Sequence, residues 1–365
     1  MLTSAAAFAL YLAVVLALLQ ASNWDPSSFV LAAENFTDRN AVPAEVTVFP
    51  GAGYDGQFFF RLAMHPLSTA HQKDGIHFDY PVYRHQRIVY PLLARLIGFG
   101  RARPTLWALI LVNLAAVAAL TYTVGLVLSA TGTHPGWGIA VPLYAGFLLT
   151  IARDLCEIVA VGFLIATIHS LQKERVVRAV ALLSIATFAK EPALLFAAGP
   201  IAVACFGRLR TRNDRMRLLF VIPPLLHIAW KRWLFYAWDI PPSFSLEPLA
   251  RPFSAYFTAL GKAAAGSVVQ VELLLLAALV MIAAPAIWTS SLRVEKTRLG
   301  CGALAILAFS LGSGFWMKDW AFLRAVSEFA SLAILLALTG ARWQRVSAAF
   351  LSVTSWCLIA MRLLA

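Results

Sequence analysis

The sequence predicts an all-α polytopic integral membrane protein, and its composition is the main reason. Of the 365 residues, 60% are hydrophobic and only 13% are charged. A soluble core of this size cannot bury so much apolar surface, so the apolar segments are expected to face a lipid bilayer. No repeat, low-complexity tract or long polar tail sets one part of the chain apart. We therefore expect one membrane domain over residues 1–365.

Eleven apolar segments have the length and composition of transmembrane helices. They lie at about 4–22, 105–130, 137–152, 155–171, 176–189, 192–206, 218–237, 267–288, 299–316, 322–340 and 346–364. The third and fifth are short: about 14–16 residues span roughly 21–24 Å at 1.5 Å per residue. A full crossing of the hydrocarbon layer needs about 30 Å. The outer ends of these two helices are therefore expected to stop below the membrane surface.

The positions of the basic residues predict the orientation. The first apolar segment, Met1 to about Ser22, lacks the basic start of a signal peptide, so we expect it to remain as the first helix. With the N-terminus in the cytoplasm, the basic connectors all lie inside, as the positive-inside rule requires. They carry Lys173, Arg175, Arg178, the five arginines from Arg208 to Arg217, Arg293, Lys296, Arg298, Arg342 and Arg345. Residues 23–104 then form a large first loop outside.

The net charge of +12 does not indicate nucleic-acid binding. The densest basic run, Gly207 to Arg217, lies between two apolar segments and fits a cytoplasmic loop. The four cysteines are scattered through apolar segments, so neither a disulfide framework nor a zinc site is indicated. The first loop contains four histidines whose spacings match no common metal-ligand motif, and these are His65, His71, His77 and His85.

Polar residues from distant segments are expected to meet at the outer face. They are Asp55 and the polar residues of the stretches "RDLCE" (153–157), "AKEP" (189–192) and "KDWAFLR" (318–324). A charge inside the bilayer costs about 2.5–3.5 kcal/mol on insertion scales, so such residues usually have a function. Glu157 lies four residues after Arg153, a spacing that places both on one helix face. Pro192 suits the first turn of a helix.

The first loop itself contains two amphipathic segments, "GQFFFRLAMHP" and "RIVYPLLARLIGFG", which are suited to lie in the membrane interface. Between them, "DYPVYRHQR" supplies Arg84 and Arg87. The loop is rich in aromatic residues, which are expected to form a shelf at the level of the lipid headgroups. These are Phe58, Phe59, Phe60, Tyr80, Tyr83 and Tyr90.

The pattern "YDGQFFFRLA … YRHQRIVYPLLARL" resembles the GT-C superfamily of polytopic glycosyltransferases. It is similar to the branch of GPI mannosyltransferase-like enzymes and their bacterial cell-surface glycopolymer relatives, and "RDLCE" and "FAKEPALLF" resemble later motifs of that branch. The resemblance extends from about Tyr54 to Phe196. It implies an inverting transferase that moves a hexose, such as mannose, from a polyprenyl-phosphate donor. It also implies Asp55 as the catalytic base and a bacterial inner membrane as the location, with the active site facing outward.

The residues are compatible with that chemistry. Inverting transfer needs one carboxylate to accept the proton of the acceptor hydroxyl. Arg and Lys can stabilise the leaving phosphate through charge-assisted hydrogen bonds. The sequence contains no Asp-x-Asp metal clamp, so a metal-independent reaction without a cofactor is expected. The candidate substrate-binding residues are Tyr54, Gly56, Gln57, Arg84, Arg87, Arg153, Asp154, Glu157, Lys190, Glu191 and Arg324.

Each of these residues also has a structural interpretation. Asp55 is a favoured residue for capping the following helix, and Gly56 suits a plain turn. Arg153 and Glu157 can pair across one helical turn, while Lys190 and Glu191 can be solvated. Arg84 and Arg87 can extend to the interface, and the two tryptophans of the last outer stretch, Trp316 and Trp320, fit an interface belt.

Two other functions compete with the transferase hypothesis. A transporter or lipid flippase often contains inverted repeats and helices broken near mid-membrane. The sequence contains no convincing repeat, and its charges cluster at one face rather than at the midplane. A polysaccharide polymerase or ligase has a similar number of spans, but such proteins tend to carry their large outer loop late in the chain. The sequence leaves open which sugar is moved, which lipid carries it, and whether the acceptor is a lipid, a glycan or a protein.

Overall fold

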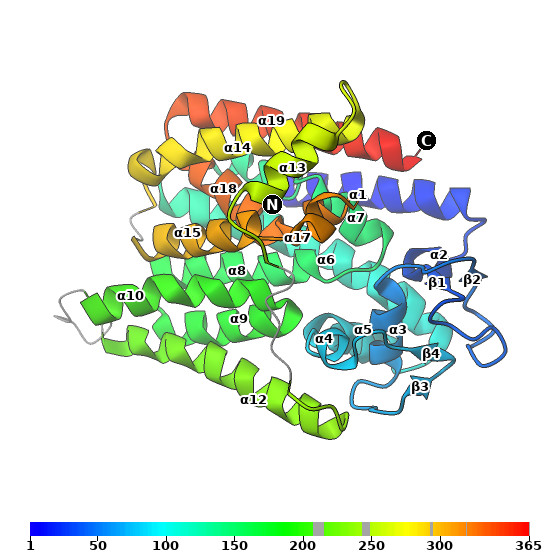
Figure 1. Cartoon of the computed structure of the whole chain (residues 1–365). Coiled ribbons are helices and arrows are strands. Elements are labelled where there is room, and N and C mark those ends of the chain that lie inside the picture. The colour runs from blue at the N-terminus through cyan, green and yellow to red at the C-terminus, as the bar shows by residue number, and fades with distance from the viewer. Residues whose placement is uncertain (207–214, 243–248, 293–294, 319, 365) are drawn as a thin grey trace.

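Helices make up most of the chain and run alongside one another in the computed structural model (Figure 1). The structure describes residues 1–206, 215–242, 249–292, 295–318 and 320–364, without the side chains of 295–298. Residues 23–104 gather at one end of the helix bundle, which we call the loop end. The basic connector at 207–214 and Arg293 lie outside the described residues, as does Asp319 of the "KDWAFLR" stretch.

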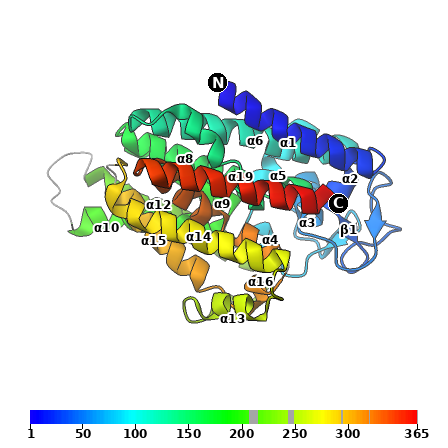
Figure 2. The same cartoon turned by 90° about the horizontal axis from the view of Figure 1, so that it is seen from above.

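Within the described residues, five helical segments are long and apolar enough to cross a membrane. They are α1 (Leu2–Ala21), α6 (Ala102–Ala130), η3 with α12 (Arg217–Val221 and Ile222–Ala237), α14 (Val268–Thr289) and α19 (Arg342–Leu364). Figure 2 shows α1, α19 and α14 running in the same general direction across one face. The chain is thus an all-α protein of membrane type, and a total of eleven spans stays a prediction.

Shorter apolar helices complete the bundle. They are α8 (Glu157–Gln172), α9 (Val176–Ala189), η2 with α10 (Glu191–Ala197 and Ala198–Phe206), α13 (Ser254–Lys262), α15 (Glu295–Phe309) and α18 (Ser327–Leu338). In particular, α8 packs on α6, α9 and α18. Pro192 lies in the first turn of η2, as expected. Every residue of α18 is buried, so this helix is the centre of the C-terminal half.

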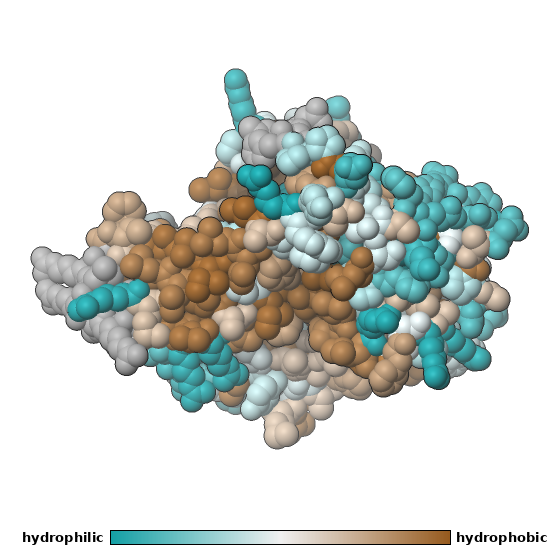
Figure 3. All heavy atoms as spheres, turned by 90° about the horizontal axis from the view of Figure 1, so that it is seen from below, coloured by the Kyte–Doolittle hydropathy of each residue, from teal (hydrophilic) through white to brown (hydrophobic). Residues whose placement is uncertain are grey.

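The bundle presents apolar side chains to its surroundings, as a membrane protein must. Phe350 on α19 is 67% exposed and Met281 on α14 is 73% exposed. Figure 3 shows apolar surface across the middle of one face, with hydrophilic surface gathered at the loop end and a smaller hydrophilic group at the opposite end. Such an apolar band between two polar ends matches the layering of a bilayer.

The single helix expected over 137–152 is wrong. The chain forms η1 (Pro135–Ala140), a turn, and then α7 (Gly146–Ala152). Pro142 lies in the turn, where its missing N–H and fixed φ prevent a continuous helix. Its carbonyl accepts a hydrogen bond of 2.6 Å from the Tyr11 hydroxyl. The expected spans 299–316 and 322–340 are also divided, because α16 (Ser313–Trp316) follows α15 and α17 (Ala321–Ala325) precedes α18.

The loop-end segment folds as a small packed unit and does not form a flat interfacial shelf. It contains α2 (Ser27–Val30), α3 (Gly56–Met64), α4 (Pro81–His85) and α5 (Val89–Gly98), with two short sheets. The strand pairs are β1 (Ala32–Ala33) with β2 (Val48–Phe49), parallel, and β3 (Gln72–Lys73) with β4 (Ile76–His77), antiparallel.

The structure corrects the expectation that the first amphipathic segment lies in the membrane interface. All nine residues of α3 are buried, because this helix packs against α5, α6 and β4. The aromatic shelf is therefore also wrong for Phe58, Phe59, Phe60 and Tyr90, which are core residues, whereas Tyr80 is 69% exposed. Only α5 presents an apolar face outward, through Leu92, Leu96 and Ile97.

Candidate functional site

Nine charged side chains from separate segments gather at the loop end. Seven of them form one continuous chain of ion pairs, and Arg87 with Glu191 forms a separate pair beside it. We call all nine the network. The network contains Asp55, Asp79, Arg84, Arg87, Glu157, Lys190, Glu191, Arg324 and Glu328. They come from the start of α3, from α4 and its flanks, from the start of α8, from the α9–η2 junction, and from α17 and α18. The structure thus brings together most of the charged residues that the sequence placed at one face.

Asp55 lies between two arginines. Its Oδ1 is 2.8 Å from Nη1 of Arg84, and its Oδ2 is 2.6 Å from Nη2 of Arg324. The side chain is 17% exposed. Asp55 occupies the N-cap position of α3 but makes no side-chain capping bond. The structural interpretation of Asp55 as a helix cap therefore does not hold, because its carboxylate is used for ion pairing.

Gly56 and Gln57 position Asp55. A Cβ atom on Gly56 would lie 2.6 Å from the carbonyl oxygen of Arg153 and 2.8 Å from that of Val30, so only glycine fits here. The Gln57 amide is buried, and its Oε1 accepts a 3.0 Å hydrogen bond from the Thr37 hydroxyl. These two predicted binding residues therefore face the protein itself and hold the start of α3 in place.

Arg84 connects Asp55 to a residue that the sequence did not indicate. Its Nε and Nη2 donate to the two carboxylate oxygens of Asp79 at 2.7 and 2.6 Å. Its guanidinium also lies 4.6 Å from the ring centroid of Phe58. A bidentate pair of this kind is strong and fixes the plane of the guanidinium. Asp79 and Phe58 therefore hold Arg84 facing Asp55.

Arg324 connects Asp55 to the interior. Its Nε donates to Oε1 of Glu157 at 3.0 Å, and its guanidinium lies 5.4 Å from the ring centroid of Tyr54. Glu157 is completely buried. A buried carboxylate must be paired, so Glu157 fixes Arg324 at the mouth of the network.

Lys190 is the buried centre of the network and is not solvated. Its Nζ lies 3.0 Å from Oε2 of Glu328 and 3.7 Å from Oε1 of Glu157. It also donates to the Ser327 hydroxyl at 3.1 Å and to the Arg324 carbonyl at 2.8 Å. Lys190 thereby ties the end of α9 to α17 and α18. The neighbouring Glu191 has a different partner.

Arg87 and Glu191 form the outer edge of the network. Nε and Nη2 of Arg87 donate to the Glu191 carboxylate at 2.8 and 2.6 Å, and Nη2 also donates to the Tyr83 hydroxyl at 2.7 Å. Arg87 is only 5% exposed, so it does not extend to the interface. The pair joins the α4–α5 connection to the start of η2.

The expected pairing of Arg153 with Glu157 on one helix face is wrong. The chain breaks between α7 and α8, where Asp154 has a left-handed φ of 47°. The two residues therefore do not share a helix turn. Nη1 of Arg153 donates to the carbonyl of Ala152 at 2.9 Å, and no carboxylate among the described residues pairs with this guanidinium. Arg153 is half-buried beside the network.

Asp154 is not part of the network, contrary to the prediction. It is completely buried, and Tyr90 donates a long hydrogen bond of 3.4 Å to its Oδ1. Nδ2 of Asn113 donates to the hydroxyl of Tyr90 at 3.0 Å. Burial raises the pKa of Asp154 well above its ordinary value, and the contact with Tyr90 does not offset it. Asp154 is therefore a buried acid beneath the site, outside the ion pairs.

The charges of the network almost cancel. Four cations (Arg84, Arg87, Lys190 and Arg324) face five carboxylates (Asp55, Asp79, Glu157, Glu191 and Glu328). Burial opposes the charged form of Asp55, but Arg324 and Arg84 outweigh it and hold the pKa of Asp55 below its ordinary value. Asp55 is therefore a carboxylate at neutral pH.

Two tryptophans expected at the interface lie elsewhere. Trp316 is 1% exposed and stacks between Phe309 and Phe322, with centroid distances of 5.9 Å to both rings. Trp320 is partly buried, and the guanidinium of Arg362 lies 4.7 Å from its ring centroid. Both tryptophans thus support α17, which carries Arg324.

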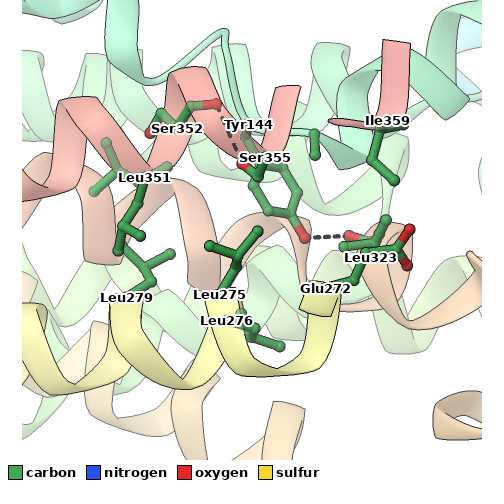
Figure 4. Close-up of a pocket in the computed structure, with 12 residues that line it drawn as sticks. Tyr144, Glu272, Leu275, Leu276, Leu279, Leu323, Leu351, Ser352, Ser355 and Ile359 are labelled. Atoms are coloured by element: carbon green, nitrogen blue, oxygen red, sulfur yellow. Dashed lines mark hydrogen bonds between the residues drawn. The ribbon is translucent and has the colours of Figure 1, made fainter. Parts of the chain in front are cut away.

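A small cavity lies behind α17, between α14 and α19 (Figure 4). Its volume is about 30 Å³, and its lining is mainly leucine and isoleucine from α14, α18 and α19. At one end, the hydroxyl of Tyr144 donates to the carbonyl of Leu323, and Glu272 pairs with Nη1 of Arg362 at 3.0 Å. None of the nine network residues lines this cavity.

The histidines of the first loop do not converge. His65 pairs with Asp74 at 2.9 Å, and Nε2 of His85 lies 2.7 Å from the carbonyl of Pro66. Across the part of the chain that the structure describes, no group of three or more His, Cys, Asp or Glu side chains is placed to hold a metal ion.

No family model matches this chain, and neither a curated protein nor a solved structure matches it. The chemistry of the site therefore has to be argued from its own residues. A carboxylate held ionised and partly open to solvent can accept a proton. Arginines that face it can bind an anion, and phosphate is the anion that a guanidinium fork fits best.

Proposed function

We propose that this protein is an inverting glycosyltransferase. It transfers a hexose from a polyprenyl-phosphate donor to a lipid or glycan acceptor, and Asp55 is the general base. The observation that carries the proposal is the position of Asp55, which is ionised and 17% exposed between Arg84 and Arg324 at the loop end of a membrane-type bundle. The motif resemblance around Tyr54–Ala63 supports it.

The reaction uses one carboxylate. Asp55 accepts the proton of the acceptor hydroxyl while that oxygen attacks the anomeric carbon of the sugar. The bond between the anomeric carbon and the phosphate oxygen breaks, and the phosphate leaves with the electron pair. A retaining reaction would instead use two carboxyl groups about 5 Å apart, one of them as nucleophile. The two carboxylates that share an arginine with Asp55 are those of Asp79 and Glu157, and each is held by that arginine.

Arg153 is a further cation beside the site that can contact the donor phosphate. It is half-buried next to Tyr54 and Gly56, and among the described residues it has only a carbonyl as a hydrogen-bond partner. Guanidinium groups stabilise the charge that develops on a leaving phosphate. Metal-independent transfer is part of the proposal, because the arginines supply the positive charge.

The proposed location is the extracytoplasmic side of a bacterial inner membrane, with the N-terminus in the cytoplasm. The basic residues Lys173, Arg175 and Arg178 lie at the α8–α9 connection, at the opposite end of α8 from Glu157. This arrangement follows the positive-inside rule when the loop end faces outward. Prenyl-linked donors are available there, whereas nucleotide sugars are not expected.

The proposal is tested by transfer in liposomes. Wild type, Asp55→Asn and the control Asp38→Asn are reconstituted with a panel of radiolabelled polyprenyl-phosphate sugars and a membrane extract as acceptor. Asp38 is an exposed aspartate of the same segment. We expect wild type and Asp38→Asn to transfer label, and Asp55→Asn to lose about 10²- to 10⁴-fold, the usual value of a general base.

Two results would contradict the proposal. If Asp55→Asn transferred sugar at the wild-type rate, Asp55 would not be the general base. A wild type that moves labelled lipid across the bilayer without transferring the sugar would identify a transporter instead. Mild acid releases sugar that is still on the prenyl phosphate but not sugar that has been transferred to an acceptor, so mild hydrolysis followed by chromatography distinguishes these outcomes.

A further inference from the structure

The two arginines that face Asp55 are held in place independently of it. Arg84 is fixed by both oxygens of Asp79, and Arg324 is fixed by Glu157 and lies against the Tyr54 ring. Neither guanidinium therefore has to move if the Asp55 carboxylate leaves. The pair is a preformed anion site whose present occupant is a side chain of the same protein.

This site belongs to the accessible part of the network. The side chains of Asp55, Arg84 and Arg324 are 17%, 15% and 14% exposed, whereas those of Glu157 and Lys190 are 0% and 4% exposed. A ligand that enters from solvent can thus reach the Asp55 ion pairs but not the buried half. Any anion that binds the arginines must compete with Asp55.

The chemistry of the two anions is alike. A carboxylate presents two oxygens on one carbon, and Asp55 gives one to each arginine. A phosphodiester likewise presents two charged oxygens on one phosphorus and can occupy the same two guanidinium groups. The network has no surplus positive charge for a second anion, since its four cations already face five carboxylates.

We propose that Asp55 is an internal competitor for the phosphate site, and that a prenyl phosphate group binds Arg84 and Arg324 by displacing its carboxylate. This inference rests on the proposed function. Displacement removes two positive neighbours from Asp55 and leaves it free to meet the acceptor hydroxyl. The base thus becomes available only when the donor phosphate is bound.

The inference gives an unusual expectation for a catalytic carboxylate. Asp55→Asn removes the competing negative charge but keeps the size of the side chain. It should therefore bind a short-chain prenyl phosphate more tightly than wild type, by about tenfold, as expected for relief of one close charge pair. Asp38→Asn should bind as wild type does. Arg84→Met and Arg324→Met should bind more weakly.

The experiment is calorimetric titration of detergent-solubilised full-length protein with the prenyl phosphate, the corresponding prenyl alcohol and inorganic phosphate. Tighter binding of both phosphates by Asp55→Asn, with no change for the alcohol, supports the exchange. Tightening for the prenyl phosphate alone also supports it and identifies the lipid phosphate as the ligand. Equal or weaker binding by a folded Asp55→Asn overturns the exchange, as does a lack of phosphate binding by every variant.

A second variant covers a failure of Asp55→Asn to fold. Asp55→Ser also removes the charge, and the same tightening is expected. The result separates this inference from the proposed function. If the Asp55 variants bind phosphate as wild type does but lose sugar transfer, Asp55 is the base and the proposed competition is rejected. If the variants bind phosphate more tightly and still transfer sugar fully, the competition is supported and the role of Asp55 as the base is rejected.

Discussion

Two buried ion-pair regions of this molecule differ in what they connect. The pair of Glu272 and Arg362 joins α14 to α19 beside an apolar cavity (Figure 4). The ion-pair network joins the loop-end segment to three separate parts of the bundle, and Asp55 and Glu157 are each shared by two cations. Burial of a charge alone therefore does not identify a functional site. The convergence of many segments on one partly exposed carboxylate is the reason for placing the proposed site at the loop end.

The largest expected effect comes from the buried centre of the network. Lys190→Met leaves Glu157 and Glu328 without their shared cation in the interior. Removing one partner from a buried ion pair costs about 3–5 kcal/mol. We therefore expect a large loss of unfolding free energy, measured by denaturant titration in detergent. Lys173→Met, an exposed lysine, is the control, and equal stability of the two variants would contradict the structural role of Lys190.

A second prediction concerns the backbone contact that positions Asp55. Gly56→Ala places a Cβ atom 2.6 Å from the Arg153 carbonyl, so the α3 start or the 153–154 loop must shift. Overpacking of this kind costs about 1–3 kcal/mol. Gly162→Ala is the matched control, since nothing lies within 4 Å of its Cβ and alanine is favoured in a helix. We expect the melting temperature, measured by thermal unfolding, to fall for Gly56→Ala but not for Gly162→Ala.

A third prediction concerns pH. The pKa of Asp55 is lowered in the folded protein because Arg324 and Arg84 outweigh the effect of burial. Its ion pairs therefore contribute stability above the ordinary aspartate value of about 3.9, and this contribution is lost as the pH falls through the folded pKa. In Arg84→Met the pKa of Asp55 rises towards its ordinary value, so less stability is lost on acidification and the loss is complete at a higher pH.

The measurement for this prediction is unfolding free energy against pH for wild type, Arg84→Met and Asp55→Asn. The difference in unfolding free energy between wild type and Asp55→Asn should persist at neutral pH and shrink on acidification. A loss of stability on acidification that is as large in Arg84→Met as in wild type would show that Arg84 does not control Asp55.

The sequence was sufficient for the helical class and for the convergence of distant charges, because hydropathy and basic connectors specify which segment ends share a face. It was insufficient to predict which charged residues pair with each other. The spacing of Arg153 and Glu157 indicated one helix face, and the left-handed backbone of Asp154 breaks that helix. A break of this kind is decided by tertiary packing, which local spacing does not report.

Two further residues show the same limit. Asp79 and Glu328 were not singled out, although a lone glutamate in the apolar stretch 322–340 is the type of signal that marks a buried partner. The amphipathic pattern of α3 was assigned to the interface, because a helix covered by a loop and one covered by lipid share the same periodicity. Only the packing of β4, α5 and α6 on α3 distinguishes them.

The smallest expected effect lies in the other region and sharpens the contrast. Ser352 lines the cavity between α14 and α19, and its buried hydroxyl has no hydrogen-bond partner among the described residues. Ser352→Ala removes an unsatisfied group, so the unfolding free energy should stay within about 0.5 kcal/mol of wild type. Sugar transfer should be unchanged, because no network residue lines this cavity. A tenfold loss of transfer in this variant would mean that the cavity belongs to the substrate site, and the division between a catalytic loop end and a structural α14–α19 contact would then fail.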